Sequence, residues 1–160
     1  MPIACGEVVS GSTICSTNEG SLASMSSSDC GYTEGYGVWY VHTGNGLPVQ
    51  ITTCAPEFQY DTHLQVYTGS CGELTCYAWN DDYGYGPGGS IPELDELCTG
   101  SPMMGLQSGL VFDTEVGETY FIYVSGFADD TGGFDFTLSC TIPVFGCTDD
   151  TAINLSLIHI

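Results

Sequence analysis

Short runs of β-branched and aromatic residues, separated by glycine, asparagine and aspartate, dominate the chain. Runs of this length and composition are typical of β-strands, and the intervening residues are typical of turns. The predicted strands are residues 38–43, 49–53, 63–67, 109–112, 119–124 and 134–138. Six short strands at fairly even spacing predict an all-β fold, an antiparallel β-sandwich of jelly-roll or immunoglobulin-like type.

The hydrophobic pattern also predicts how two of these strands are buried. In 63–67, Leu64 and Val66 point to one face, which predicts a single core-facing side. Residues 119–124 are apolar at both alternating sets of positions. This predicts a central strand, because only a strand covered on both sides can bury both faces.

Two segments interrupt this pattern. Residues 82–108 are rich in glycine and predict a long surface insertion, held down through Cys98, with a single helical turn at 93–97. Residues 141–160 follow the last predicted strand. The expected organisation is therefore a sandwich over residues 1–140 and a linker or tail segment over 141–160.

Charge removes several classes of function. The 160 residues include 20 Asp plus Glu and no Lys or Arg, for a formal net charge of −20. Phosphate clamps, Schiff-base lysines and basic nucleic-acid grooves need side chains that are absent here. We expect no nucleic-acid partner and no membrane insertion, since no stretch approaches the ~20 apolar residues of a membrane span.

Nine cysteines are scattered along the chain without C-x-x-C pairs or histidines at zinc spacing. This distribution favours a disulfide-stabilised domain formed in an oxidising compartment, and hence an extracellular or cell-surface location. Eight cysteines lie between residues 5 and 140 and can close in any of 105 ways. The pairing we expect is Cys71–Cys76, Cys5–Cys140, Cys30–Cys54 and Cys15–Cys98, which leaves Cys147 to reach outside the domain.

A series of motifs resembles one known family. The motifs are Gly37-Val38-Trp39-Tyr40, residues 60–67 (YDTHLQVY), Asn80-Asp81-Asp82, residues 116–126 (VGETYFIYVSG) and residues 133–138 (GFDFTL). In this order they resemble the bacterial pre-peptidase C-terminal domain family over residues 5–140. The resemblance implies a small β-sandwich appended to secreted proteases and surface proteins, without catalytic activity. The 82–108 insertion and the lack of basic residues depart from it.

A second resemblance covers residues 145–154. Gly146-Cys147-Thr148-Asp149 is similar to the start of the short Cys-rich repeats in the tails of large bacterial surface proteins. The residues after Asn154 do not continue that pattern.

Oxygen donors in the predicted loops suggest a Ca²⁺ site, because this hard cation takes carboxylate and amide oxygens. The donors are Asp61, Asn80, Asp81, Asp82, Asp129 and Asp130, with Asp81 and Asp82 as the best candidates. Calcium is the only cofactor that the sequence suggests. The alternative for Asp61 is a local hydrogen bond to the backbone before its strand.

Catalytic signals are weak, and we expect no enzyme. The three histidines are His42, His63 and His159, and no G-x-S-x-G elbow is present. His42 and His63 fall in predicted strands, and we expect each histidine to face solvent. With 20 acidic residues, some carboxylate pairs lie close together by chance, so their proximity carries no information about glycoside hydrolysis.

Aromatic residues in two loop regions suggest carbohydrate binding, because sugar rings stack on aromatic faces. Tyr32 and Tyr36 belong to one region, and the candidate ligand-binding residues Tyr77, Trp79, Tyr83 and Tyr85 belong to the other. The alternative is that these loops pack down over the ends of the sandwich.

The function that the sequence favours is a structural or adhesive module, repeated in a surface assembly or filament by strand addition between copies. The linking segment would be the tail, with Ile153, Leu155 and Leu157 on one face, or the N-terminal strand at Glu7-Val8-Val9. We therefore expect self-association. The alternative function is a carbohydrate-binding accessory module of a secreted bacterial enzyme.

Overall fold

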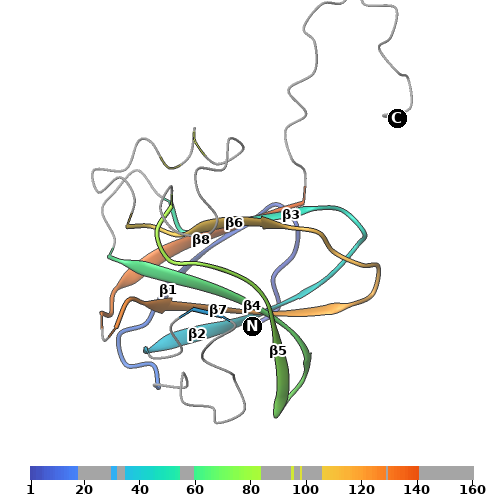
Figure 1. Cartoon of the computed structure of the whole chain (residues 1–160). Coiled ribbons are helices and arrows are strands. Elements are labelled where there is room, and N and C mark those ends of the chain that lie inside the picture. Colours follow the sequence, from blue (N-terminus) through green and yellow to red (C-terminus); the bar gives the residue numbers. More distant parts are fainter. Residues whose placement is uncertain are drawn as a thin grey trace, which may run out of the picture.

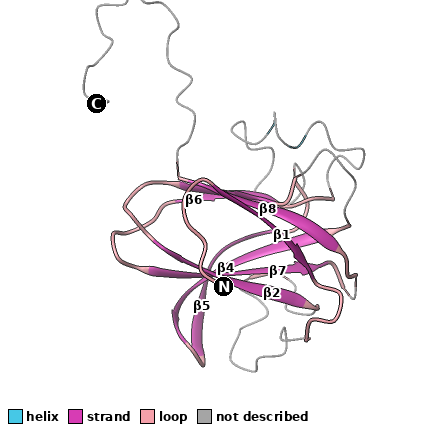
Figure 2. Cartoon of the chain, turned by 180° about the vertical axis from the view of Figure 1, so that it is seen from behind, coloured by secondary structure: helices cyan, strands magenta, loops and turns pink. Residues whose placement is uncertain are grey.

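The structure is a computed structural model, and it describes residues 1–17, 30–31, 35–54, 60–83, 95, 98, 106–128 and 130–140. This part of the chain forms eight strands in two facing layers (Figures 1 and 2). The strands are β1 (Glu7–Ser12), β2 (Gly37–Thr43), β3 (Val49–Thr52), β4 (Thr62–Ser70), β5 (Glu73–Asn80), β6 (Gly109–Phe112), β7 (Thr119–Gly126) and β8 (Gly133–Ser139).

The strand order identifies the sandwich as a jelly roll. One sheet has the order β1-β8-β3-β6 and the other β2-β7-β4-β5. Each early strand lies beside a late one: β1 beside β8, β2 beside β7, β3 beside β6 and β4 beside β5, all antiparallel. This nested pairing of first with last, second with second-last and so on is that of a jelly roll. The predicted all-β sandwich is confirmed, and all six predicted strands are present.

The core lies between the two sheets, where the inward faces meet. Leu64 and Val66 of β4 are fully buried there, as the alternation predicted. β7 lies between β2 and β4, so the prediction of a central strand is also confirmed. Across the core, the rings of Tyr40 and Phe136 have their centroids 4.9 Å apart.

A second apolar layer covers the outer face of the β2-β7-β4-β5 sheet. Tyr67 and Tyr123 are buried in it, and Trp39 and Trp79 pack against it. The segment at Cys30 is fastened to this face by the disulfide with Cys76. Both faces of this sheet are therefore covered.

This covering overturns the expectation that the strand histidines face solvent. His63 on β4 is only 1% exposed, and its imidazole meets the ring of Trp79 edge to face at 5.9 Å. His42 on β2 is 3% exposed. His159 lies outside the described residues.

The N-terminal segment closes the outer edge of β2. Pro2 forms a parallel bridge with Val41, Ile3 N donates to Val41 O at 2.9 Å, and Val41 N donates to Met1 O at 2.8 Å. The chain then crosses to the other sheet, where β1 pairs with β8 from Glu7↔Leu138 to Ser12↔Gly133. Glu7-Val8-Val9 thus pairs within its own sheet, at the edge of that sheet, and the expectation that it adds to a neighbouring copy stays a prediction.

Three disulfides fasten the described part of the chain, and only one was predicted correctly. The bonds are Cys5–Cys140, as predicted, Cys30–Cys76 and Cys54–Cys98. Cys15 and Cys71 are exposed free thiols. The predicted pairs Cys71–Cys76, Cys30–Cys54 and Cys15–Cys98 are wrong.

The β4–β5 hairpin explains the first of these errors. Cys71 and Gly72 form its two-residue turn, between the paired residues Ser70 and Glu73. Cys76 lies three residues further along β5, about 10 Å from the turn at ~3.3 Å per residue. That separation is too long for a disulfide, whose Cα atoms lie within about 7 Å.

The long insertion corresponds to the connection between β5 and β6, and Cys98 within it is bonded to Cys54 as a tether. Most of this connection lies outside the described residues, including the predicted helical turn at 93–97 except for Asp95. The tail at 141–160 also lies outside them. No helix in the described part of the chain is long and apolar enough to cross a membrane.

Candidate metal centre

Three carboxylates converge at one end of the β4–β5 pair. Asp61 directly precedes β4, and Asp81 and Asp82 directly follow β5. Because the two strands are antiparallel, with Leu64 opposite Asn80, the start of one lies beside the end of the other. One carboxylate oxygen from each of the three residues lies within 4.8 Å of the other two.

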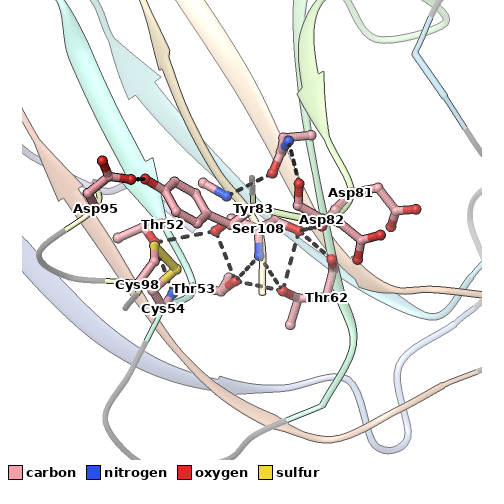
Figure 3. The surroundings of a disulfide bond; sticks show 12 residues. Thr52, Thr53, Cys54, Thr62, Asp81, Asp82, Tyr83, Asp95, Cys98 and Ser108 are labelled. Atoms are coloured by element: carbon pink, nitrogen blue, oxygen red, sulfur yellow. Dashed lines mark hydrogen bonds between the residues drawn. A yellow bond between two sulfur atoms is a disulfide. The ribbon is translucent and has the colours of Figure 1, made fainter. Parts of the chain in front are cut away.

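A buried group of hydroxyls supports this end of the sheet (Figure 3). Ser108 N donates to Thr53 Oγ1 at 3.1 Å and to Thr62 Oγ1 at 3.0 Å. The hydroxyls of Thr53 and Thr62 are 2.6 Å apart. All three residues are fully buried, so this network fixes the backbone at Thr62, directly after Asp61.

The same network reaches the loop after β5. The Ser108 hydroxyl contacts the backbone carbonyl oxygens of Thr62 and Asp81. Asn80 Oδ1 accepts from Gly109 N at 3.0 Å, and Asn80 Nδ2 donates to Asp82 O at 3.2 Å. The Asn80 amide, a predicted cation ligand, therefore holds the loop through both of its polar atoms.

The three carboxylates repel one another and are partly removed from water. Burial raises the pKa of Asp61 from 3.8 to about 6, and the charges of Asp82 and Asp130 add to the effect. Burial also raises the pKa of Asp81 to about 6, with further contributions from Asp82 and Asp61. The pKa of Asp82 is raised as well, through burial.

Two oxygen atoms of the cluster lack a partner. Asp61 Oδ1 and Asp81 Oδ1 are both buried and accept no hydrogen bond. A buried carboxylate oxygen without a partner is costly, and no Lys or Arg exists anywhere in the chain to neutralise it. The donor set consists only of oxygen, which suits Ca²⁺. Asp130 lies close enough for its charge to act on Asp61.

The structure groups three candidate Ca²⁺ ligands, one more than the two that the sequence favoured. Asp81 and Asp82 were the preferred ligands, and they are joined by Asp61, for which a local backbone role was the alternative. The available signal is that Asp61 directly precedes one strand of a hairpin and Asp81 directly follows the other. Asp129 lies outside the described residues.

Of the candidate ligand-binding residues Tyr77, Trp79 and Tyr83, only Tyr77 is exposed. Tyr83 is only 7% exposed, and its hydroxyl contacts the Asp95 carboxylate, so its ring face is not open to a sugar. Trp79 is partly buried in the layer over the outer face. Tyr77 is 46% exposed, with its hydroxyl donating to Asp113 O at 3.0 Å.

The other predicted site residues lie outside the described part of the chain. They are Tyr85, Cys147, Ile153, Leu155 and Leu157.

Comparisons with known proteins give only weak likenesses. No family model matches the sequence, and neither does any curated protein. Among solved structures, the chain is similar to the pre-peptidase C-terminal domain of a collagenase from Bacillus anthracis. The sequence identity is 9% and the TM-score 0.45, over 86% of this chain and 92% of that one. The order and pairing of the strands identify the jelly roll.

Proposed function

We propose that this chain is a non-catalytic accessory module of an extracellular protein and that it binds Ca²⁺ at Asp61, Asp81 and Asp82. The observation that carries the proposal is the convergence of three carboxylates with two buried, unpartnered oxygen atoms. A bound divalent cation would offset the mutual repulsion of the carboxylates and would give the two unpartnered oxygen atoms a ligand interaction. The non-catalytic part follows the resemblance of the sequence motifs to accessory domains.

An extracellular setting fits both the disulfides and the calcium. Three disulfides in one domain are typical of an oxidising compartment. Extracellular modules commonly bind Ca²⁺ with dissociation constants of about 10⁻⁴–10⁻³ M. Bound Ca²⁺ would tie the start of β4 to the connection after β5, the same connection that the Cys54–Cys98 disulfide fastens to the end of β3.

Isothermal titration calorimetry tests this proposal on the full chain after treatment with a chelator. We expect one Ca²⁺ per chain with a dissociation constant below about 1 mM. The double variant Asp61→Asn/Asp81→Asn should lose this binding, because amides carry no charge.

The matched control is Asp113→Asn, which removes an exposed carboxylate after the far end of β6. It should bind Ca²⁺ like the unmodified chain. Absence of saturable binding by the unmodified chain, or equal binding by the double variant, would contradict the proposal.

Self-association is a second candidate function, favoured by the placement of the two free thiols. Thr13 Oγ1 lies 3.1 Å from the hydroxyl of Tyr60, so Cys15 lies near the start of β4. Cys71 lies beyond the other end of β4, whose nine residues span about 30 Å. Thiols at opposite ends cannot bond within one copy, but they can link successive copies head to tail.

This linkage can be tested with oxidised glutathione, a small disulfide that accepts the two electrons and leaves as two thiols. We expect a ladder of covalent oligomers, strengthened by salt because the charge of −20 makes copies repel. The ladder should be lost in Cys15→Ser/Cys71→Ser. A ladder that persists in this variant, or one weakened by salt, would refute head-to-tail linkage through these residues.

A further inference from the structure

A second cluster of ligand atoms lies in a cavity at the edge of β2, away from the acidic residues. The cavity has a volume of about 390 Å³ and is lined by the N-terminal segment and the end of β2, including Cys5, Glu7, His42 and Asn45. Cys5 is exposed, and its disulfide partner Cys140 is buried. The cavity therefore gives solvent access to one sulfur of the disulfide that closes the domain.

His42 lies directly against this disulfide. One of its imidazole nitrogens and the Sγ atoms of Cys5 and Cys140 all lie within 4.8 Å of one another. These three residues are far apart in sequence, which is why no cysteine and histidine spacing indicated them. Their approach depends on the N-terminal segment pairing with β2 on one side and on β1 pairing with β8 on the other.

The hydrogen bonds of His42 leave one nitrogen available. Nδ1 lies 3.2 Å from the carbonyl oxygen of Ile3. A carbonyl only accepts, so Nδ1 carries the proton and Nε2 of the neutral ring keeps its lone pair. Nε2 is buried without a hydrogen-bond partner among the described residues, and the residue as a whole is only 3% exposed. Metal-binding histidines commonly have this arrangement, with the second nitrogen donating to a backbone carbonyl.

We propose that reduction of the Cys5–Cys140 disulfide creates a Zn²⁺ site formed by Cys5, Cys140 and His42. While the disulfide is intact, its sulfurs are uncharged and poor ligands, so the site is closed. A dithiol reductant transfers two electrons and two protons to the disulfide and itself becomes a disulfide. Zn²⁺ then displaces both thiol protons to solvent and binds the two thiolates and the imidazole.

The backbone geometry allows this exchange of ligands. Zn–S bonds are about 2.3 Å, so two thiolates on a tetrahedral ion lie about 3.8 Å apart. The Cα atoms of Cys5 and Cys140 are 5.2 Å apart, so rotation of the two side chains can open the sulfurs to that distance. Cys5 and His42 both line the cavity, so water can supply the fourth ligand, as in zinc sites with three protein ligands.

The test uses Co²⁺, whose bonds to thiolates give visible absorption bands. The free thiols are first removed in a Cys15→Ser/Cys71→Ser/Cys147→Ser background of the full chain. The reductant is then limited so that it opens only the solvent-accessible Cys5–Cys140 bond, which is checked by mapping the cysteines that become alkylated, while Cys30–Cys76 and Cys54–Cys98 stay intact. In that state we expect one Co²⁺ per chain, displaced by one equivalent of Zn²⁺, and no thiolate band before reduction. The Cys5→Ser/Cys140→Ser variant, which has neither sulfur, should show no such band in either state.

The two buried histidines provide a matched pair. His42→Gln should weaken Co²⁺ binding by more than about tenfold, because loss of an outer-shell partner alone costs 10–100-fold. His63→Gln, an equally buried change in the other part of the sheet, should leave it unchanged. Equal affinity in the unmodified background and in His42→Gln would overturn the proposal, and so would Co²⁺–thiolate bands before reduction.

Reduction could also unfold the protein, so circular dichroism is followed during the titration. In that case Zn²⁺, but not Ca²⁺, should restore the β-sheet spectrum of the reduced chain. A reduced chain that stays unfolded with excess Zn²⁺ would refute the proposal. Calcium binding by the oxidised protein is measured separately, so neither result depends on the other.

Discussion

The acidic cluster predicts that one substitution changes stability in opposite directions with and without calcium. Asp81→Asn keeps the size of the side chain and removes one of the three charges. In the absence of Ca²⁺, we expect the variant to be more stable than the unmodified protein at neutral pH. The reason is that Asp81 is partly buried, is repelled by Asp82 and Asp61, and has an oxygen atom without a partner.

The sign follows from the direction of the pKa shift. In the folded protein the pKa of Asp81 is about 6, against an ordinary value of 3.8, so the folded state binds the proton more tightly than the unfolded state. This contribution to stability is fully present below about pH 3.8, is lost as the pH rises towards 6, and stays lost above it. The difference between variant and unmodified protein should therefore appear between pH 4 and 6.

The magnitude is set by the shift and by solvent. A rise of this size corresponds to about 3 kcal/mol as an upper limit. The side chain is only partly buried, so water screens some of the repulsion, and part of the remainder is shared with Asp61. We expect Asp81→Asn to raise the free energy of unfolding by about 1–2 kcal/mol at pH 7.5 in chelator. At pH 4 the difference should be close to zero.

Urea unfolding with the disulfides intact measures this difference. Trp79 lies two residues before Asp81 on β5, so tryptophan fluorescence reports on this end of the sheet. A change of 1–2 kcal/mol moves the midpoint by about 0.5–1 M urea for a slope of about 2 kcal/mol per molar. At a Ca²⁺ concentration 100 times the dissociation constant, the unmodified protein gains about 2.7 kcal/mol and should become the more stable of the two.

Asp113→Asn serves again as the control. Like Asp81→Asn it removes one negative charge, but at an exposed position. Subtracting its effect removes the general contribution of charge. If Asp81→Asn were no more stabilising than Asp113→Asn, or stabilising by the same amount at pH 4 and pH 7.5, the reasoning from buried repulsion would be refuted.

Two further predictions concern the hairpin turn and the long connection. Gly69→Ala should destabilise the fold by more than 1 kcal/mol in urea unfolding, because φ is +105° and a Cβ atom would overlap the Glu73 carbonyl oxygen. Gly72→Ala shares a positive φ but meets no atom within 4 Å, so it should cost less, and equal losses would contradict this. Loss of the Cys54–Cys98 disulfide, which closes a loop of 44 residues, should cost about 4 kcal/mol as measured by urea unfolding of Cys54→Ser/Cys98→Ser. A cost under 1 kcal/mol would show that the loop is fixed by other contacts.

Local alternation was enough to predict most of the strands. In β7 the apolar residues occupy both sets of alternating positions, and a strand covered on both sides accounts for that pattern. β5 was missed because Glu73, Cys76 and Ala78 dilute its β-propensity. A bulge also breaks its alternation, since the pairing shifts between Val66 and Tyr67 and leaves Tyr77 without an opposite residue.

Burial of the histidines could not be predicted, because it depends on segments distant in the sequence. On β4, Gln65 and His63 look like the polar face of a half-buried strand. The segment at Cys30 covers that face, and the Gln65 side chain donates to the Cys30 carbonyl oxygen at 2.7 Å. His42 is covered in a similar way by Ile3. Neither covering contact leaves a periodic signal in the strand itself.

The cysteine pairing shows the same limit. Sequence spacing favours near neighbours such as Cys71 and Cys76, whereas the observed bonds join residues separated by 44, 46 and 135 positions. Which cysteines meet depends on the nested order of the strands. Cys5–Cys140 was predictable because it joins the two ends of a domain whose first and last strands are neighbours.

The absence of lysine affects how this sandwich protects its edges. Edge strands commonly carry lysine or proline, which discourages pairing with other molecules. Here the β2 edge is covered by Met1–Ile3, β5 has a bulge, and β6 is only four residues long. β1 remains, with Val8 65% exposed. At that edge the protection available is the repulsion between copies that each carry a charge of −20. If Asp61, Asp81 and Asp82 bind Ca²⁺ as proposed, calcium should therefore stabilise the single copy and at the same time weaken the repulsion that keeps copies apart, and acid that protonates these three residues should act in the same way.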